Sequence, residues 1–320
     1  MKDLVLFGDC RKTLPAFIDE ARMCVTSPPY YGLRDYGGEA SQIGMEQTPE
    51  EYIQQLVEVF RLVRDNLTDD GTLWVNIGDS YYNYRSDGNY PKQTVSKTNQ
   101  DLPNFSPARG NKLQGLKSKD LIGIPWMLAF ALRADGWYLR QDIIWHKPNP
   151  MPESVRDRCT KSHEYIFLLS KNKKYYYDHE AIKEKAVGER WGGNTPINMD
   201  NTKDTDNQFS GLTRERKMVY DKKNKRSVWK VNCKPYRGAH FAVYPPELIE
   251  PCILAGSEKG DIVLDPFMGS GTTAMVAKSL GRDYIGCELH EDYGNLIQKR
   301  VDEYHPVTEV TQSPILDAFL

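Results

Sequence analysis

A glycine-rich turn late in the sequence carries the strongest chemical signal. Residues 265–273 read Asp-Pro-Phe-Met-Gly-Ser-Gly-Thr-Thr and directly follow the apolar run 262–264. The run predicts a strand that ends at Asp265, and Thr272 begins the expected helix. Glycines between such elements let the backbone approach a ligand closely, and open α/β sheets bind ligands at this end of a strand. The pattern therefore predicts a ligand-binding turn.

Glu288 and the charge of the turn narrow the class of ligand. Glu288 follows the next expected strand, 283–287. Its distance in sequence from Asp265 is close to the spacing of about 20 residues at which nucleoside-binding units place an acidic side chain that accepts hydrogen bonds from ribose hydroxyls. No Gly-Lys-Ser/Thr follows the glycines, so the turn is not a Walker-type phosphate loop. The Asp265 carboxylate would repel a pyrophosphate. Asp265 and Glu288 together therefore suit a nucleoside that carries a positively charged group, such as the amino group of a methionine moiety.

A second candidate site lies near the start of the chain. Residues 26–31 read Thr-Ser-Pro-Pro-Tyr-Tyr after the apolar run 23–26. The two prolines lack backbone N–H groups and have fixed φ angles, which leaves carbonyls free to accept hydrogen bonds. Ser27 Oγ and the Pro28 carbonyl can accept from an exocyclic amine, while the Tyr30 ring stacks on the base that carries it.

Together the two motifs resemble the permuted, beta-class DNA amino-methyltransferases, which use S-adenosyl-L-methionine to methylate cytosine N4 or adenine N6. In that family a Ser/Asp-Pro-Pro-Tyr motif precedes an Asp-Pro-Phe-x-Gly-Ser-Gly-Thr-Thr motif, as it does here. The resemblance implies that the catalytic residues are Ser27, Pro28, Pro29 and Tyr30. It implies that the residues that bind the cofactor are Asp9, Phe241, Asp265, Phe267, Gly269, Ser270, Gly271, Thr272 and Glu288.

Further segments extend the resemblance over most of the chain. Residues 136–148 and 162–166 are similar to family blocks that flank the catalytic pocket, and Asp9 lies where the family has an acidic contact near the cofactor adenine. Residues 240–245, His-Phe-Ala-Val-Tyr-Pro, take the place of the segment beside the methionine end of the cofactor. They depart from the commoner His-Pro-Thr-Gln-Lys-Pro form, which leaves the side-chain roles there open.

The residues also indicate how such a reaction proceeds. The lone pair of an exocyclic amine is delocalised into its ring, so two acceptors that draw the N–H bonds out of plane concentrate that lone pair towards the sulfonium methyl. Holding nitrogen, methyl and sulfur in line supplies the rest of the rate. The target base must leave the duplex by base flipping, which costs a few kcal/mol and explains the need for a stacking tyrosine.

The identity of the base stays a choice between two. Within the family, Ser at the first motif position favours cytosine N4 and Asp is commoner among adenine enzymes, so Ser27 favours cytosine N4, with adenine N6 as the alternative. A C5-cytosine methyltransferase would need a nucleophilic Pro-Cys after a strand. Pro251-Cys252 lies instead within a helical apolar pattern, where a Cys is typically a core residue, and the C5 interpretation is excluded.

Two further classes of function fit parts of the sequence. A non-catalytic, cofactor-dependent DNA-binding protein would keep the same turn, although the intact Ser27 and Tyr30 argue against it. Methylation of RNA or of a protein amine is compatible with a basic insert. Duplex DNA is the expected partner, with a cognate restriction endonuclease of a restriction-modification system as a further one. The chain is expected to be a monomer or a homodimer.

The expected elements place the two motifs on an α/β core. Apolar runs predict strands at 4–7, 23–26, 71–77, 137–145 and 165–170, and periodic patterns predict helices at 48–66 and 120–134. A capping box at Thr48 and Glu51 marks the start of the first of these helices. Alternating strands and helices favour a mostly parallel sheet with helices on both faces. The resemblance implies the circularly permuted, Rossmann-like methyltransferase fold.

The chain is expected to form one permuted catalytic domain with a basic insert. Residues 1–184 are the catalytic half with a long loop at 81–118, residues 239–305 are the cofactor-binding half, and residues 306–320 are a tail. Residues 185–238 are the expected target-recognition insert, because basic side chains interleaved with aromatic ones such as Trp229 suit contacts to phosphates, sugars and bases. The predicted DNA-binding residues are Arg214, Arg216, Lys217, Lys222, Lys223, Lys225, Arg226, Lys230, Lys234 and Arg237.

Composition excludes several broad classes of protein. The 320 residues carry 42 Lys and Arg against 44 Asp and Glu, a net charge of −2. This charge excludes a wholly basic, histone-like binder but not a local basic patch. Six scattered Cys residues show no metal-binding or disulfide pattern, and no metal site is expected. With no signal-peptide layout and no apolar run long enough to cross a bilayer, a cytoplasmic protein is expected.

Overall fold

The computed structural model describes residues 2–17, 20–32, 42–82, 115–186, 190–191, 217–218, 222–234 and 244–303, with the backbone alone at 190–191 and 217–218. The chain divides into two compact units, one formed by Met1–Asp178 with Ser227–Leu320 and the other by His179–Arg226. Most of the predicted loop 81–118 and all of the tail 306–320 lie outside the described residues. None of the helices in the described ranges is long and apolar enough to span a membrane.

The first unit is built on one sheet whose order is β1-β12-β11-β2-β3-β5-β4-β10. Neighbouring strands are parallel except where β5 pairs with β3 and with β4. The mostly parallel α/β sheet predicted from the sequence is therefore confirmed. The strands are β1 Leu4–Phe7, β2 Ala21–Thr26, β3 Leu67–Ile77, β4 Tyr138–His146, β5 His163–Ser170, β10 Val228–Lys230, β11 Ile262–Asp265 and β12 Asp283–Glu288.

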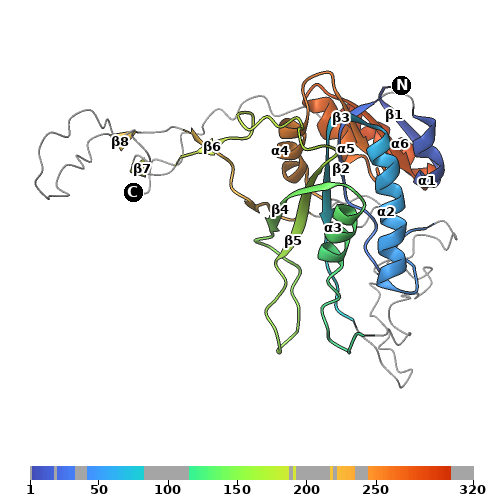
Figure 1. Ribbon diagram of the computed structural model, residues 1–320, viewed down its shortest axis with the longest axis vertical. Helices are drawn as coiled ribbons and strands as arrows, with labels where there is room; N and C mark the ends of the chain where they lie inside the picture. The colour runs from blue at the N-terminus through green and yellow to red at the C-terminus, as the bar shows by residue number, and fades with distance from the viewer. Residues whose placement is uncertain are drawn as a thin grey trace, which may run out of the picture. The chain divides into compact units, whose positions relative to one another are not determined.

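The two ends of the sequence interleave in this sheet. The late strands β11 and β12 lie between the early strands β1 and β2, and Figure 1 shows the blue N-terminal strands beside the orange and red C-terminal elements. All four strands are parallel, so their carboxyl ends meet at one edge of the sheet. The motifs at 26–31 and 265–273 follow two of these ends, and they are neighbours in space although they are far apart in sequence.

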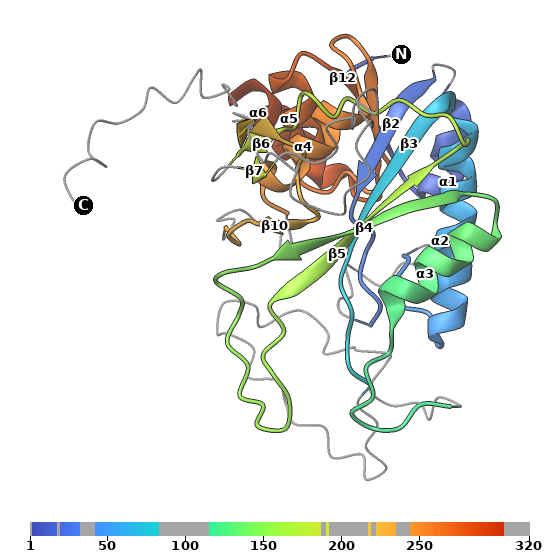
Figure 2. The same cartoon turned by 60° about the vertical axis from the view of Figure 1, so that its left-hand side comes forward.

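Helices cover both faces of the sheet, as the alternating pattern predicted. Figure 2 shows α2 and α3 on one face and α4, α5 and α6 on the other. The helices are α1 Cys10–Thr13, α2 Pro49–Asp65, α3 Ile124–Ala134, α4 Pro246–Gly256, α5 Thr272–Ser279 and α6 Gly294–Glu303, with short 3-10 turns η1 at Leu14–Ala16 and η3 at Glu291–Tyr293. Cys252 lies in α4 and is fully buried, in agreement with the interpretation of that cysteine as a core residue.

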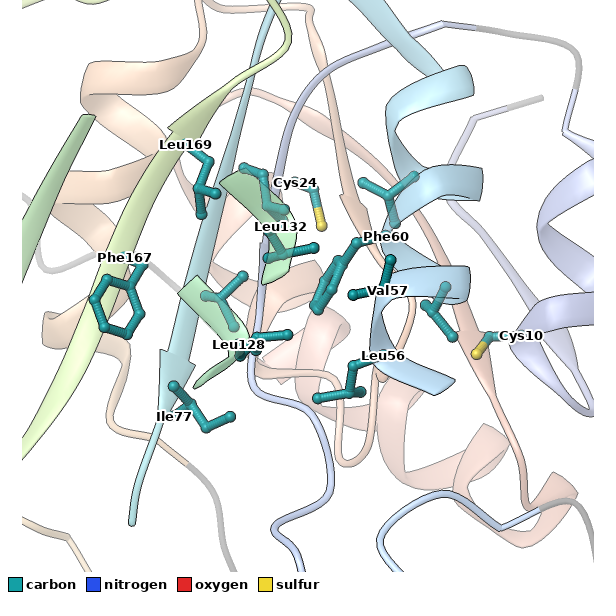
Figure 3. Close-up of a cluster of buried hydrophobic side chains, with 14 of the residues drawn as sticks. Cys10, Cys24, Leu56, Val57, Phe60, Ile77, Leu128, Leu132, Phe167 and Leu169 are labelled. Atoms are coloured by element: carbon teal, nitrogen blue, oxygen red, sulfur yellow. The ribbon is translucent and has the colours of Figure 1, made fainter. Parts of the chain in front are cut away.

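The helix α2 begins where the capping box predicted. Thr48 accepts a hydrogen bond from Glu51 N, the Glu51 carboxylate accepts from Thr48 N, and Pro49 occupies the first turn. The buried face of α2, which includes Leu56 and Phe60, packs with α3 and the sheet in one apolar core (Figure 3). Such packing supplies most of the stability of a helix in a folded protein.

The helix α3 begins four residues later than predicted. Gly123 precedes it in a left-handed conformation, with φ of +87°. The Asp79 carboxylate accepts hydrogen bonds from Gly123 N at 3.0 Å and from Ile124 N at 3.1 Å. The cap therefore comes from a residue that follows β3 in the chain, and no pattern local to residues 120–134 encodes it.

Part of the expected target-recognition insert 185–238 is a strand of the main sheet. The strand β10 pairs in parallel with β4, and Trp229 lies opposite Trp145. Trp229 is 6% exposed, so its ring is a core element of the sheet edge. The proposed contact of Trp229 with bases or sugars is wrong. In the sequence, an aromatic residue between lysines fits both a contact with DNA and a place in the core. Only the pairing of β10 with β4 shows that Trp229 belongs to the core.

The second unit contains two short antiparallel ladders within the described residues. Strand β6 Glu184–Lys185 pairs with β9 Lys222–Lys223. Strand β7 Arg190–Trp191 pairs with β8 Lys217–Met218. Each ladder pairs a strand near the start of the expected insert with a strand in its basic second half.

Candidate active site

The candidate site lies at the carboxyl ends of four adjacent parallel strands. Asp9 follows β1, Glu288 ends β12, Asp265 ends β11 and Ser27 follows β2. The Gly8 N–H donates to the Glu288 carbonyl at 2.8 Å, which joins the first two ends. Four residues predicted from separate motifs are thus brought to one edge of the sheet, where open α/β folds bind their ligands.

The Asp265 carboxylate joins the two motifs directly. It is 1% exposed, and Oδ1 accepts from Thr26 Oγ at 2.6 Å and from Phe267 N at 3.0 Å. Oδ2 accepts from Tyr244 Oη at 3.2 Å and from the Thr273 hydroxyl. Burial raises the pKa of Asp265, and these donors oppose the rise. A carboxylate with two donors on each oxygen fixes the turn to β2, to α5 and to the segment that precedes α4.

Glu288 holds the middle of the glycine turn. Its Oε2 accepts from Gly269 N at 2.7 Å and its Oε1 from His290 N at 3.0 Å. The side chain is 8% exposed, and burial raises its pKa while these two hydrogen bonds lower it. Glu288 therefore shapes the turn in addition to the ligand contact that the sequence suggested.

The remaining residues of the turn have distinct surroundings. Gly271 has φ of +81°, and a Cβ at this position would lie 2.9 Å from Ile297 Cγ2, so only glycine fits against α6. The backbone carbonyl and hydroxyl of Ser270 accept from the Arg300 guanidinium. Thr272 is 3% exposed and its Oγ has no partner among the described residues. Phe267 is half-buried against the core.

The Asp9 carboxylate bonds to Arg11, two residues later in the chain. It caps α1 by accepting from Arg11 N at 3.0 Å and pairs with the Arg11 guanidinium at 2.7 Å. Burial acts to raise the pKa of Asp9, but the hydrogen bonds and charge of Arg11 outweigh it and the pKa is lowered. Asp9 is therefore a charged carboxylate at the edge where β1 ends.

The two proline carbonyls of the Ser-Pro-Pro-Tyr segment differ in their contacts. Tyr52 Oη on α2 donates to the Pro29 carbonyl at 2.7 Å. The Pro28 carbonyl has no hydrogen-bond partner among the described residues, and Ser27 beside it is half-buried. The role of the Pro28 carbonyl as an acceptor for an amine stays a prediction.

The Tyr30 ring is fixed by residues that sequence reasoning did not assign to the site. Its hydroxyl donates to Glu164 Oε2 at 2.8 Å, and a Cβ on Gly78 would lie 2.7 Å from its Cε2. Glu164 forms an ion pair with Lys147. Both charged residues fall in the segments 136–148 and 162–166, whose likeness to family blocks was the signal that could have found them.

The basic residues predicted to bind DNA fall in both units. In the second unit, Glu184 accepts from Arg226 Nε at 2.5 Å and lies 3.5 Å from Lys223 Nζ. In the first unit, Lys234 pairs with Glu247 and Lys230 ends β10 as an exposed residue. Surface pairs of this kind contribute little to stability, and the role of these cations in DNA binding stays a prediction. Lys222 and Lys225 are also described, whereas Arg214, Arg216 and Arg237, the side chain of Lys217 and the predicted cofactor contact Phe241 lie outside the described residues.

Residues 21–299 match a protein family described as DNA methylase, N6_N4_Mtase. The chain is 49% identical over 298 residues to the Type II methyltransferase M.SmaI of Serratia marcescens, covering 93% of this chain and 90% of that protein. It is 48% identical over 280 residues to the Type II methyltransferase M.Cfr9I of Citrobacter freundii, covering 88% and 81% of the two chains.

Solved structures give the fold. The PvuII DNA methyltransferase (cytosine-N4-specific) superposes with a TM-score of 0.60 at 17% identity, covering 95% of this chain and 87% of that one. A Thermus thermophilus protein described as a putative DNA modification methylase, solved in complex with S-adenosyl-L-methionine, superposes with a TM-score of 0.56 at 23% identity and 95% coverage of both chains. The predicted Rossmann-like methyltransferase fold is confirmed.

Substituting Gly78 by Ala tests how the Tyr30 ring is seated. We expect Gly78→Ala to lower the free energy of unfolding by about 1–3 kcal/mol, because the new Cβ meets the ring and overpacking forces a shift. The same substitution in a Tyr30→Ala background should cost little, since the ring is gone. Urea unfolding of the four proteins gives the coupling. Equal costs in both backgrounds would show that the ring does not lie against Gly78.

Proposed function

The chain belongs to the DNA methylase family N6_N4_Mtase, and from this premise we propose that it methylates the exocyclic amine of cytosine, at N4, within a specific sequence of duplex DNA. The observation that carries the proposal is the hydrogen bond of 2.6 Å from Thr26 Oγ to Asp265 Oδ1. This bond joins the segment suited to an amine to the turn suited to a cofactor, so donor and acceptor of a methyl group would meet at one edge of the sheet.

The turn has the donors and acceptors that S-adenosyl-L-methionine requires. When bound, this cofactor supplies the electrophilic methyl group. The buried Thr272 hydroxyl, which has no partner among the described residues, is free to bond a ligand, and each Glu288 oxygen can accept a further hydrogen bond. Asp265 has donors on both oxygens, so we assign to it the positioning of the turn as well as the predicted contact with a positively charged group.

The acceptors for the target amine are Ser27 Oγ and the Pro28 carbonyl. Because Tyr52 occupies the Pro29 carbonyl, Pro28 presents the acceptor that can take an N–H of the base. Two acceptors on one side of the amine localise its lone pair, and the rigid prolines keep the nitrogen in an orientation that allows in-line attack. The proton released after transfer leaves through water, because a serine hydroxyl is a weak base.

The Tyr30 ring supplies a surface for the base once it has left the duplex. Stacking on an aromatic ring contributes about 1–3 kcal/mol per base, which offsets part of the cost of flipping. The preference for cytosine N4 over adenine N6 rests on Ser27, whose hydroxyl is smaller than an Asp carboxylate and uncharged. Adenine N6 is the second candidate, because both bases present an amine beside a ring nitrogen.

The basic residues of both units are proposed to bind the DNA backbone. Lys222, Lys223, Lys225 and Arg226 lie in the compact unit His179–Arg226, which supports a role for the expected insert 185–238 in target recognition. We extend the proposal to Arg214, Arg216, Lys217 and Arg237 on the sequence alone. Binding through such contacts should weaken steeply as salt concentration rises. A cognate restriction endonuclease is the partner expected for a relative of Type II methyltransferases.

Analysis of the methylated nucleoside tests the proposal. Purified protein, duplex DNA and cofactor labelled in its methyl group should yield label only in N4-methylcytidine after digestion to nucleosides. Label in N6-methyladenosine would reverse the choice of base and leave the reaction class intact. Absence of label in any DNA nucleoside, with the cofactor shown to bind, would contradict the reaction itself and favour a non-catalytic DNA-binding protein.

Removal of the Glu288 carboxylate tests the cofactor site. We expect Glu288→Ala to weaken binding of S-adenosyl-L-methionine by about 1.5–3 kcal/mol, because hydrogen bonds to a charged acceptor are lost. Isothermal titration measures the dissociation constant. Glu291→Ala is the matched control, since Glu291 is an exposed residue three positions later and its loss should leave affinity unchanged. Equal affinities for the two variants would refute the assignment of Glu288.

A further inference from the structure

Three side chains at the ends of neighbouring strands gather beside the Tyr30 hydroxyl. Asn76 is the penultimate residue of β3, Glu164 is the second residue of β5, and Lys147 directly follows β4. Because β5 is antiparallel to both of its neighbours, its start lies beside their ends. The reversed strand therefore brings a carboxylate to the edge of the sheet that carries Ser27 and Tyr30.

The Glu164 carboxylate is held by contacts other than the one to Tyr30. Its Oε1 pairs with Lys147 Nζ, and its Oε2 accepts from Asn76 Nδ2 at 3.3 Å. Lys147 is itself located by the Trp145 ring, whose centroid lies 4.1 Å from Nζ. The side chains of Lys147 and Glu164 are 17% and 14% exposed, so the pair is largely removed from water. A charge-assisted pair in such a setting holds its geometry more firmly than a solvated one.

On the proposed function of the chain, we propose that Glu164 is a positioning residue for Tyr30. Its fixed carboxylate receives the Tyr30 hydroxyl at 2.8 Å and so determines the plane of the ring on which the flipped base stacks. Gly78 limits the ring from the side at Cε2. The hydrogen bond to Glu164 and the steric contact with Gly78 restrict the orientation of the ring, and Asn76 Oδ1 lies 3.5 Å from the same hydroxyl as a second, longer acceptor.

The protonation state of Tyr30 agrees with this role. Burial and then the negative charge of Glu164 raise the pKa of Tyr30 well above its usual range, while a hydrogen bond with Ser27 opposes the rise. The phenol therefore stays protonated and donates to Glu164 at neutral pH. Because Ser27 also acts on this hydroxyl, a shift of the ring would affect the residue proposed to accept from the target amine.

The test compares Glu164→Leu and Glu164→Gln with Tyr30→Phe. Glu164→Leu removes the acceptor and should lower kcat/KM for DNA about tenfold, with the affinity for S-adenosyl-L-methionine unchanged. Glu164→Gln should recover most of the loss, because an amide can accept from Lys147 and still bond the phenol. Tyr30→Phe should match Glu164→Leu, and the double variant should be no slower than either. Glu303→Leu, an exposed residue of α6 paired with Lys299, is the control.

A second measurement does not need methyl transfer. With 3-fluorotyrosine incorporated, the ¹⁹F resonance that disappears in Tyr30→Phe reports the environment of this ring. It should be a single sharp line in the unaltered chain and in Glu164→Gln, and should broaden or split in Glu164→Leu. If the unaltered chain methylates no DNA while the resonance behaves as expected, the proposed function fails and the positioning role stands.

Three outcomes would overturn the positioning role. Independent, multiplicative losses in the double variant would show that Glu164 does not act through the Tyr30 hydroxyl. A Glu164→Gln variant as slow as Glu164→Leu would show that the carboxylate charge itself matters. A sharp, unshifted resonance in Glu164→Leu would show that the ring is held by other contacts.

Discussion

The buried carboxylate of Asp265 is the constraint on which the site depends. Burial of a charge is unfavourable unless donors surround it, and here donors come from β2, from the turn, from α5 and from Tyr244. Loss of any one donor leaves a lone pair unsatisfied in an apolar setting. The network therefore couples the position of the glycine turn to that of Thr26, and the residue after Thr26 is the serine proposed to bind the amine.

Strand direction explains which residues meet at the edge. Parallel strands bring the residues at or just after their carboxyl ends to one edge, which accounts for Asp265 and Glu288 and for Asp9 and Ser27. The antiparallel β5 delivers a residue from its start instead, which accounts for Glu164. A single reversed strand thus adds a charged pair, with Lys147, beside the aromatic ring.

Much of this arrangement could be predicted from the sequence because its signals are local. A Gly-rich turn after a strand, two prolines before a tyrosine and a capping box each act within a few residues. Glu164 and Asn76 could not be placed in the same way, since their roles arise from pairing between distant strands. The prediction for Trp229 was wrong for a related reason. The basic residues around it suggested a contact with DNA, whereas the pairing of β10 with β4 makes it a residue of the core.

The hydrogen bond between Thr26 and Asp265 is open to a direct measurement. Thr26→Val keeps the shape of the side chain and removes the hydroxyl, with Thr68→Val, whose hydroxyl bonds Asp70, as the control. The coupling of the two motifs predicts that Thr26→Val loses about 1–3 kcal/mol of unfolding free energy and slows methyl transfer in single-turnover assays, although Ser27 and Tyr30 are intact. Unfolding and transfer indistinguishable from those of the unaltered chain would contradict that coupling.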